Sequence, residues 1–134
     1  IGRADLFSWT AGRHGSTFGG NAVACAAALA TLDLVEGGLA ENAATVGAQL
    51  MERLRSVQSD HPDRIVDVRG RGLMIGVECR DHDAAAALEQ ACFRQGLLVL
   101  TCGPAAVRMA PPLVVTPEQA DLAVDLLTAA LADV

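Results

Sequence analysis

The sequence predicts an α+β fold, a small and mostly antiparallel sheet of about three to four strands with helices packed on one face. Its elements are expected in the order helix, helix, strand, strand, helix, strand, strand, helix. Short apolar runs bounded by glycine and proline indicate the strands, and apolar residues at spacings of three and four indicate the helices. The 134 residues suffice for one domain, and a 51% hydrophobic composition with only 3% aromatic residues predicts a core of Ala, Leu and Val.

The first third of the chain is expected to be a loop followed by two helices. Residues 1–20 hold several glycines and show little periodicity. Asn21 suits the N-cap of a helix at 22–36, which is apolar nearly all round and should therefore be covered on most sides. Because 134 residues are few for such burial, we expect a missing domain or partner to cover it. After Gly37 and Gly38, an amphipathic helix is expected at 39–59.

The remainder should build the sheet and its last two helices. A helix is expected at 83–95, closed by Gly96. Thr116 and Pro117 begin the final helix, where Thr-Pro-Glu-Gln has the pattern of a capping box. Four strands are expected, at 65–68, 73–77, 97–100 and 107–109.

Charge and cysteine content exclude several classes of function. A formal net charge of −6 argues against nucleic acid and anionic membranes as partners. We find no signal-peptide pattern and expect no apolar stretch of membrane-spanning length. The cysteines have no metal-ligand spacing, so we expect no metal site and instead reduced, buried thiols of a cytoplasmic protein; they are Cys25, Cys79, Cys92 and Cys102.

Residues 14–21 read His-Gly-Ser-Thr-Phe-Gly-Gly-Asn and lead directly into the alanine-rich helix. The hydroxyls of Ser16 and Thr17, the glycines and the free backbone N–H groups of a helix start are what a phosphate group requires. His14 lies in the same loop and could orient Thr17. The alternative is an ordinary helix start built from turn residues.

Arg108 is the second candidate, for a carboxylate. It lies between two apolar residues of an expected strand, so its side chain should point to the opposite face from theirs. A guanidinium can hold a carboxylate with two parallel N–H bonds. The alternative is a solvated arginine on an edge strand. We interpret Arg69 and Arg71 as hairpin and surface-pairing residues, and we find no defensible catalytic base, triad or carboxylate pair.

Taken together, the motifs at residues 14–21, 68–78, 96–103 and 107–119 resemble those of the class III aminotransferases, which are fold-type I enzymes that use pyridoxal 5′-phosphate. The resemblance covers essentially the whole chain. Within the family it is most like the 4-aminobutyrate aminotransferase branch, particularly over residues 96–103 and 113–119. Acetylornithine and ornithine aminotransferases share most of these motifs.

The resemblance implies roles for three residues. Thr17 matches the threonine that hydrogen-bonds the cofactor phosphate, typically of the neighbouring subunit, and Ser16 lies beside it. Arg108 matches the arginine that binds the carboxylate of an α-amino acid substrate. Ala22 departs from the family pattern, which usually has proline there, and this removes a little preorganisation of the helix start.

The chain contains ten arginines and no lysine, so it lacks the family's cofactor-binding lysine. We therefore expect a C-terminal small domain at 21–134, preceded at 1–20 by the end of a missing large domain. Such a fragment would be inactive alone. The intact homodimer would move an amino group from a 4-aminobutyrate-like donor to 2-oxoglutarate in the cytoplasm. The alternatives are an acetylornithine- or ornithine-type fragment, or a non-catalytic, stand-alone α+β binding domain.

Overall fold

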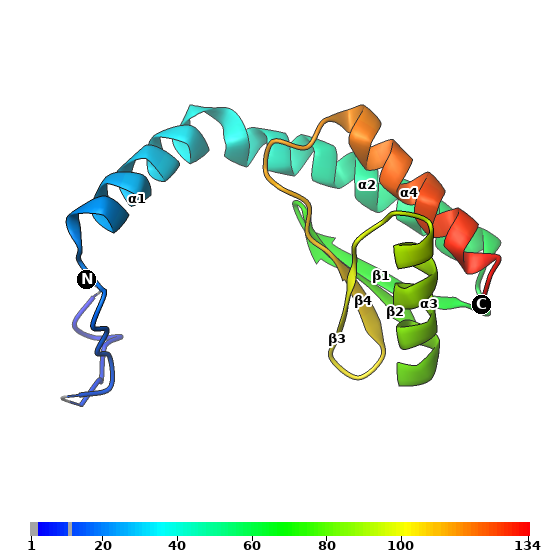
Figure 1. Cartoon of the computed structure of the whole chain (residues 1–134), viewed down its shortest axis with the longest axis horizontal. Helices are drawn as coiled ribbons and strands as arrows, with labels where there is room; N and C mark the ends of the chain where they lie inside the picture. Colours follow the sequence, from blue (N-terminus) through cyan, green and yellow to red (C-terminus); the bar gives the residue numbers. More distant parts are fainter. Residues whose placement is uncertain (1–2, 11) are drawn as a thin grey trace. The chain divides into compact units, whose positions relative to one another are not determined.

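A computed structural model describes residues 3–10 and 12–134, which divide into two compact units (Figure 1). The first unit ends at Glu36 and contains a loop and helix α1 (Ala22–Leu34). The second unit, Gly37–Val134, contains all the other helices and strands of the described residues. The π-helical turn η1 (Val35–Leu39) spans the boundary, and its Gly38 has a φ of 132°, outside the helical range. The assignment of residues 1–20 to a preceding domain stays a prediction.

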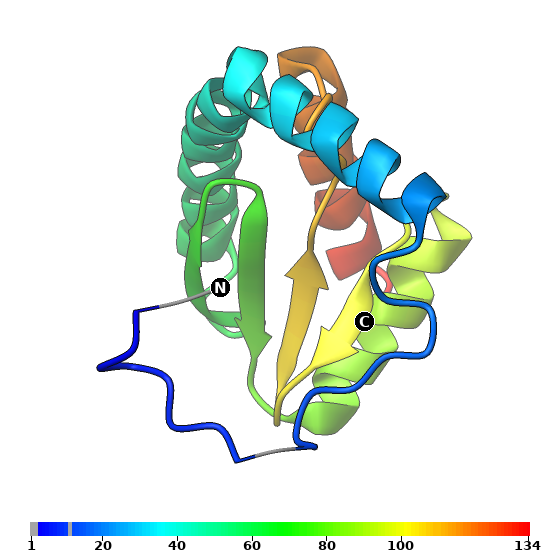
Figure 2. The same cartoon turned by 90° about the vertical axis from the view of Figure 1, so that its left-hand side faces the viewer.

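The second unit has the predicted α+β architecture. Its strands form one antiparallel sheet in the order β1-β2-β4-β3 (Figure 2). The strands are β1 (Ile65–Arg71), β2 (Met74–Cys79), β3 (Leu100–Cys102) and β4 (Ala106–Met109). The helices are α2 (Ala40–Asp60), α3 (His82–Arg94) and α4 (Pro117–Leu131).

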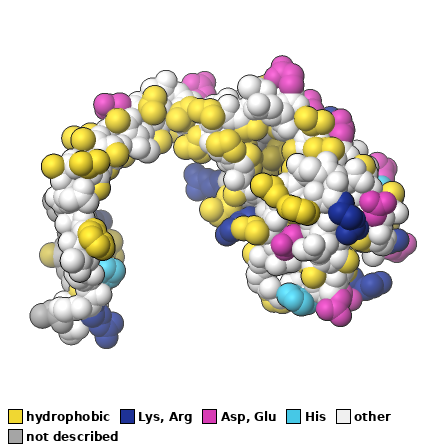
Figure 3. All heavy atoms as spheres, viewed as in Figure 1, with side chains coloured by type: hydrophobic (Ala, Val, Ile, Leu, Met, Phe, Trp, Pro, Cys, Tyr) yellow, Lys and Arg dark blue, Asp and Glu magenta, His cyan; other side chains and the backbone are white. Residues whose placement is uncertain are grey.

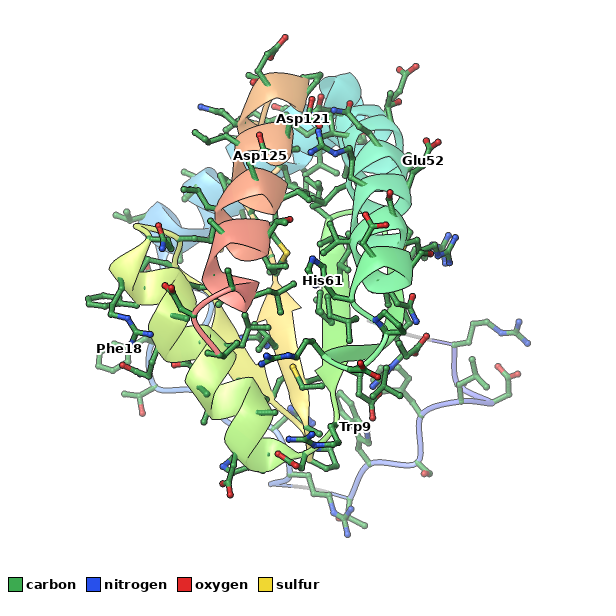
Figure 4. The ribbon with its side chains drawn as sticks, turned by 90° about the vertical axis from the view of Figure 1, so that its right-hand side faces the viewer. Trp9, Phe18, Glu52, His61, Asp121 and Asp125 are labelled. Carbon is green, nitrogen blue, oxygen red and sulfur yellow. The ribbon has the colours of Figure 1, made fainter. Side chains whose placement is uncertain are left out.

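All three helices of this unit lie on one face of the sheet, as the sequence predicts. Figure 4 shows α4 between α2 and α3, with the sheet behind them. Alternation along the strands sends Ile75, Val77 and Val107 toward the helices, where none of them is exposed. Leu50 and Leu127 reach the same core from α2 and α4. The opposite face carries the charged residues of the strands.

Local signals in the sequence locate most element ends. The Thr116 side chain accepts from the backbone N–H of Gln119, and the Gln119 side chain returns the bond, so the predicted capping box is confirmed. The strand expected at 97–100 instead begins at Leu100. The N–H of Leu97 is taken by the carbonyl of Cys92 at 2.9 Å, which keeps that residue attached to the end of α3.

Helix α1 begins where it was predicted to. The Asn21 side chain accepts from the N–H of Ala24 at 2.9 Å, as an N-cap should. Its apolar residues, among them Val23, Leu29 and Leu32, are more than half exposed. Figure 3 shows hydrophobic side chains along this helix with few charges between them. Residues of its own unit leave this helix exposed, and the expectation that a missing domain or partner covers it stays a prediction.

One helical stretch, Ala22–Asp60, is long and apolar enough by composition to cross a membrane, with a mean hydropathy of 1.6 over its most apolar part. This corrects our expectation that no such stretch exists. It is weak evidence for a membrane, because core helices and signal sequences have the same properties. Gly38 also interrupts the stretch. The 13 residues of α1 alone extend about 20 Å, against about 30 Å for a bilayer core.

Polar contacts from α2 fix the segments that follow β4. The Asn42 amide donates to the backbone carbonyls of Leu113 and Val115, at 2.7 and 3.1 Å. About three helical turns further along α2, Arg53 pairs with Asp121 and Asp125 of α4 at 3.0 and 2.7 Å. Figure 4 labels both of these carboxylates on α4. The loop that leaves the end of β4 is thus held to a rigid helix.

Helix α2 approaches the β1–β2 turn so closely at Gly47 that no side chain fits. A Cβ added there would lie 2.7 Å from the Gly72 Cα and closer still to its carbonyl group. Both sides of the contact are backbone, so neither can swing away. Gly72 itself has a φ of 55°, the left-handed region that favours glycine.

We predict that Gly47→Ala destabilises the chain by about 1–3 kcal/mol, since the added methyl forces backbone apart. Thermal unfolding followed by circular dichroism measures this. Gly37→Ala is the matched control, because a Cβ there meets nothing within 4 Å. Equal unfolding temperatures for the two variants would contradict the close approach.

The cysteines are all unpaired, and they differ in exposure. Cys79 and Cys92 are buried as expected, but Cys25 is exposed and Cys102 is half-buried, so burial was correctly predicted for only part of the set. Burial raises the pKa of the Cys92 thiol to about 11, and the neighbouring Cys79 contributes to the shift. Burial also raises the pKa of Cys79. Both groups resist ionisation because a thiolate would lose its hydration in the core.

The raised pKa of Cys92 predicts a loss of stability in alkali. Between pH 9 and about 11 the unfolded thiol releases its proton while the folded one retains it, so the free energy of unfolding falls as pH rises. Urea titrations across this range, under reducing conditions, should show a shallower decline for Cys92→Ala. Cys25→Ala, at an exposed position, should leave the slope as it is. A Cys92→Ala profile parallel to that of the parent chain would contradict the assignment.

Candidate functional site

The face of the sheet that the helices of the second unit leave open carries the candidate substrate-binding residue (Figure 2). Across this face, the strand register places Arg69, Gly76, Arg108 and Leu100 in one row. A second row holds Asp67, Glu78, Ala106 and Cys102. Residues of one row lie directly opposite each other on neighbouring strands, and the two rows are two residues apart along the strands.

Arg108 lies on β4 with a free approach on one side. Its neighbour across β2 is Gly76, and across β3 it is the exposed Leu100. Within the described residues its guanidinium forms no ion pair. The expected placement is confirmed, because Arg108 is exposed while Val107 and Met109 are buried on the other face. Its exposure leaves all five N–H donors available to a carboxylate.

Gly76 has no structural reason to be glycine in this unit. Its φ lies outside the left-handed region, and a Cβ would meet only the Arg69 carbonyl oxygen, at 3.9 Å. A glycine inside a strand weakens it and often marks a place where a ligand or another backbone approaches. Here it leaves the space between two arginines unfilled.

Arg69, in contrast to Arg108, forms two ion pairs within this chain, both from its Nη1 atom. Its guanidinium donates to the Asp67 carboxylate at 2.9 Å and to the Glu78 carboxylate. The hydrogen bond to Asp67, and then that to Glu78, raise the pKa of Arg69 above its usual value. This agrees with the interpretation of Arg69 as a surface-pairing residue. Its particular partners could not be predicted from the sequence, because they depend on the register between β1 and β2.

The phosphate-site motif lies in the first unit, as a turn immediately before α1. The N–H of Gly19 donates to the Ser16 carbonyl at 3.3 Å, and a Cβ at Gly19 would lie 3.1 Å from the Ser16 Cβ. Gly20 has a φ of 77°. Ser16 and Thr17 are both exposed. The glycines thus fold the backbone tightly around the Ser16 side chain and leave the two hydroxyls open, next to a positive helix end.

His14 does not orient Thr17 in this structure. Its ring stacks on Trp9, with the ring centroids 3.9 Å apart and the planes 21° from parallel. Phe7 adds a second aromatic contact to Trp9, at 4.4 Å. The three rings fold the preceding loop onto itself, which is a structural role that the sequence did not reveal.

The two predicted groups therefore belong to different units, Ser16 and Thr17 to the first and Arg108 to the second. Each is described within its own unit. Among residues 3–10 and 12–134, no three histidine, cysteine or acidic side chains come together in a way that could hold a metal ion. What this part of the chain offers is a glycine-containing turn with two exposed hydroxyls before a helix, and an exposed guanidinium.

Comparison with known proteins agrees with this picture. The family model described as Aminotransferase class-III matches residues 1–131. The chain is 42% identical over 129 residues to an acetylornithine aminotransferase of Bacillus anthracis, covering 95% of this chain and 33% of that protein. It is 45% identical over 115 residues to an ornithine aminotransferase of a Geobacillus strain, covering 85% of this chain and 28% of that protein.

Among solved structures, the chain is similar to an amine transaminase from an uncultivated Pseudomonas species in its PLP-bound form. The two are 38% identical with a TM-score of 0.81, over 90% of this chain and 30% of the other. This chain thus spans about a third of the length of the relatives that it matches.

Proposed function

Because the chain belongs to the class-III aminotransferase family, we propose that it forms the C-terminal part of an aminotransferase that depends on pyridoxal 5′-phosphate. In this proposal the chain supplies binding groups. Arg108 holds the carboxylate of the amino acid and 2-oxo acid substrates. Thr17, with Ser16 beside it, holds the cofactor phosphate across a homodimer. The remaining polypeptide supplies the lysine, which this sequence does not contain.

The observation that carries the proposal is the contrast between the two arginines of one row. Arg69 donates to two carboxylates of this chain through its Nη1 atom, whereas Arg108 forms no ion pair within the described residues and lies beside a glycine. A guanidinium forms two parallel bonds to a carboxylate, which fixes the orientation of the substrate as well as its position. Arginine also stays protonated throughout the working pH range, so its hold on the substrate does not titrate.

The residues near α1 fit a phosphate group. A Cβ at Gly19 would press on the Ser16 side chain, so glycine keeps this turn tight, and both hydroxyls remain exposed as donors. The first backbone N–H groups of α1 lie next in the chain, at its positive end. When bound, pyridoxal phosphate supplies the carbonyl group and electron-withdrawing ring that carry an amino group between substrates.

For the amino donor we propose the acetylornithine or ornithine class, with 2-oxoglutarate as acceptor. The names of the relatives described above support this alternative. They do not support the 4-aminobutyrate-like donor that the sequence motifs favoured, and that narrower prediction is withdrawn. We also propose a cytoplasmic location, which the four unpaired cysteines favour because a reducing compartment keeps thiols free.

We predict that Arg108→Ala, in the full-length protein that carries this chain, lowers kcat/KM for glutamate and 2-oxoglutarate by about 100-fold, through loss of a bidentate, charged contact. Steady-state kinetics measure this. Arg108→Lys retains the charge but not the forked pair of N–H donors, so its kcat/KM should lie between those of the parent protein and Arg108→Ala. Arg55→Ala, an exposed arginine of α2, is the control. An unchanged kcat/KM in Arg108→Ala would remove this residue from the substrate site.

We predict that Thr17→Ala weakens cofactor binding by about tenfold, the effect expected from one hydrogen bond to a charged group. Equilibrium titration of the full-length apoenzyme with pyridoxal phosphate, followed by tryptophan fluorescence, gives the dissociation constant without an activity assay. Thr10→Ala, another exposed threonine of the same unit, should have no effect. Equal dissociation constants for the two variants would exclude Thr17 from the phosphate site.

A further inference from the structure

We propose that Arg69 is a positioning residue for Arg108, because it ties down the Glu78 carboxylate that would otherwise occupy the Arg108 guanidinium. The inference rests on the proposed function, in which Arg108 binds substrate carboxylates. It adds a reason for the Arg69 ion pair, which the substrate site itself does not require.

Glu78 lies diagonally between the two arginines. Arg69 and Arg108 both face Gly76, one from β1 and the other from β4, and Glu78 is two residues beyond Gly76 on the same face. Arg69 reaches this diagonal neighbour, as their ion pair shows. Glu78 has the same diagonal relation to Arg108, and a long side chain covers that distance. With no side chain at Gly76, nothing on β2 separates the two guanidinium groups.

Without Arg69, Arg108 is the strand arginine that lies nearest to Glu78 by register, and Arg80, two residues beyond Glu78 in the chain, already pairs with Asp81 at 3.2 Å. Arg71 is the other arginine here, and it faces Met74, four residues along β2 from Glu78. That separation is about 13 Å at 3.3 Å per residue. The diagonal to Arg108 is only about 7–8 Å between Cα atoms. A released Glu78 carboxylate therefore pairs most readily with Arg108.

Such pairing matters because a carboxylate of the same chain competes with the substrate carboxylate for Arg108, and it does so at a high effective concentration. Groups tethered on one scaffold reach effective concentrations in the millimolar range or above. Substrates of typical enzymes bind in the micromolar to millimolar range, so a free Glu78 would occupy Arg108 for much of the time. Two acceptors on Arg69 prevent this: Asp67 fixes the guanidinium from its own strand, and the guanidinium then holds Glu78.

The test uses the full-length protein with three variants, Arg69→Gln, Glu78→Gln and the two combined. We expect Arg69→Gln to raise KM for glutamate and 2-oxoglutarate by about fivefold, the size of one exposed ion pair, with kcat within about twofold of the parent. The combined variant should return KM to the parent value, since the competing carboxylate is gone. Glu78→Gln alone should not raise KM.

Arg71→Gln is the matched control, because it removes an equal charge from the same strand and face. A similar rise in KM in Arg71→Gln would show that the loss of any positive charge on this face has the same electrostatic effect, and it would overturn the proposal. A rise in Arg69→Gln that Glu78→Gln does not reverse would show a purely structural role, and so would loss of kcat with lowered Tm. If Arg69→Gln fails to fold, Arg69→Met replaces it, since it keeps much of the side-chain length without a charge, and reversal by Glu78→Gln remains the deciding result.

The kinetics of Arg108→Ala separate failure of this inference from failure of the proposed function. If Arg108→Ala leaves KM and kcat/KM unchanged, Arg108 is not the substrate clamp and both proposals fall. If Arg108→Ala impairs carboxylate binding while Arg69→Gln has no effect on KM, the clamp stands and only the positioning role of Arg69 is overturned.

Discussion

The alternation of side chains along an antiparallel sheet that is covered on one face governs the second unit. Burial of Ile75, Val77 and Val107 beneath the helices fixes which face of each strand points inward. The same alternation sends Glu78 and Arg108 to the open face, where burial no longer selects for apolar residues. A register slip of one residue would bury the guanidinium and expose the core. The strand register therefore determines both the stability of the unit and the placement of Arg108.

On the open face, the ion pairs that already exist determine which arginine is available to a ligand. Exposed ion pairs contribute little to stability, typically about 0–1 kcal/mol, so the Arg69 cluster is a weak explanation of folding. Its more specific consequence is that it determines which neighbouring arginine pairs with the acidic side chains. Arg69 occupies the acidic groups of its own strand and of β2, whereas Arg108 is left facing a glycine and a leucine. Two chemically identical side chains thereby acquire different roles.

The sequence predicted what depends on local chemistry and missed what depends on register. Asn21 and Thr116 are capping residues whose hydrogen bonds span three residues, so both helix starts could be predicted. The start of β3 depends on the bond from Leu97 back to α3, and strand pairing itself is non-local. Arg108 could be assigned to the outward face from its own strand, but the Glu78 carboxylate could be placed near it only once β1, β2 and β4 were aligned.

An all-arginine complement of cations suits a chain whose contribution is binding. Guanidinium groups stay protonated and are poor nucleophiles, so they hold carboxylates and phosphates without reacting. A lysine at the position of Arg108 would give one compact charge, with a pKa that shifts on burial and a geometry that does not fix the plane of a carboxylate. In transamination the plane of the substrate decides which bond is aligned for cleavage, so a forked donor on a rigid strand controls orientation where a flexible ammonium would not. In the proposed function, the bond-making amine and the orienting cation are therefore carried by different segments of the polypeptide, and this chain would carry the second.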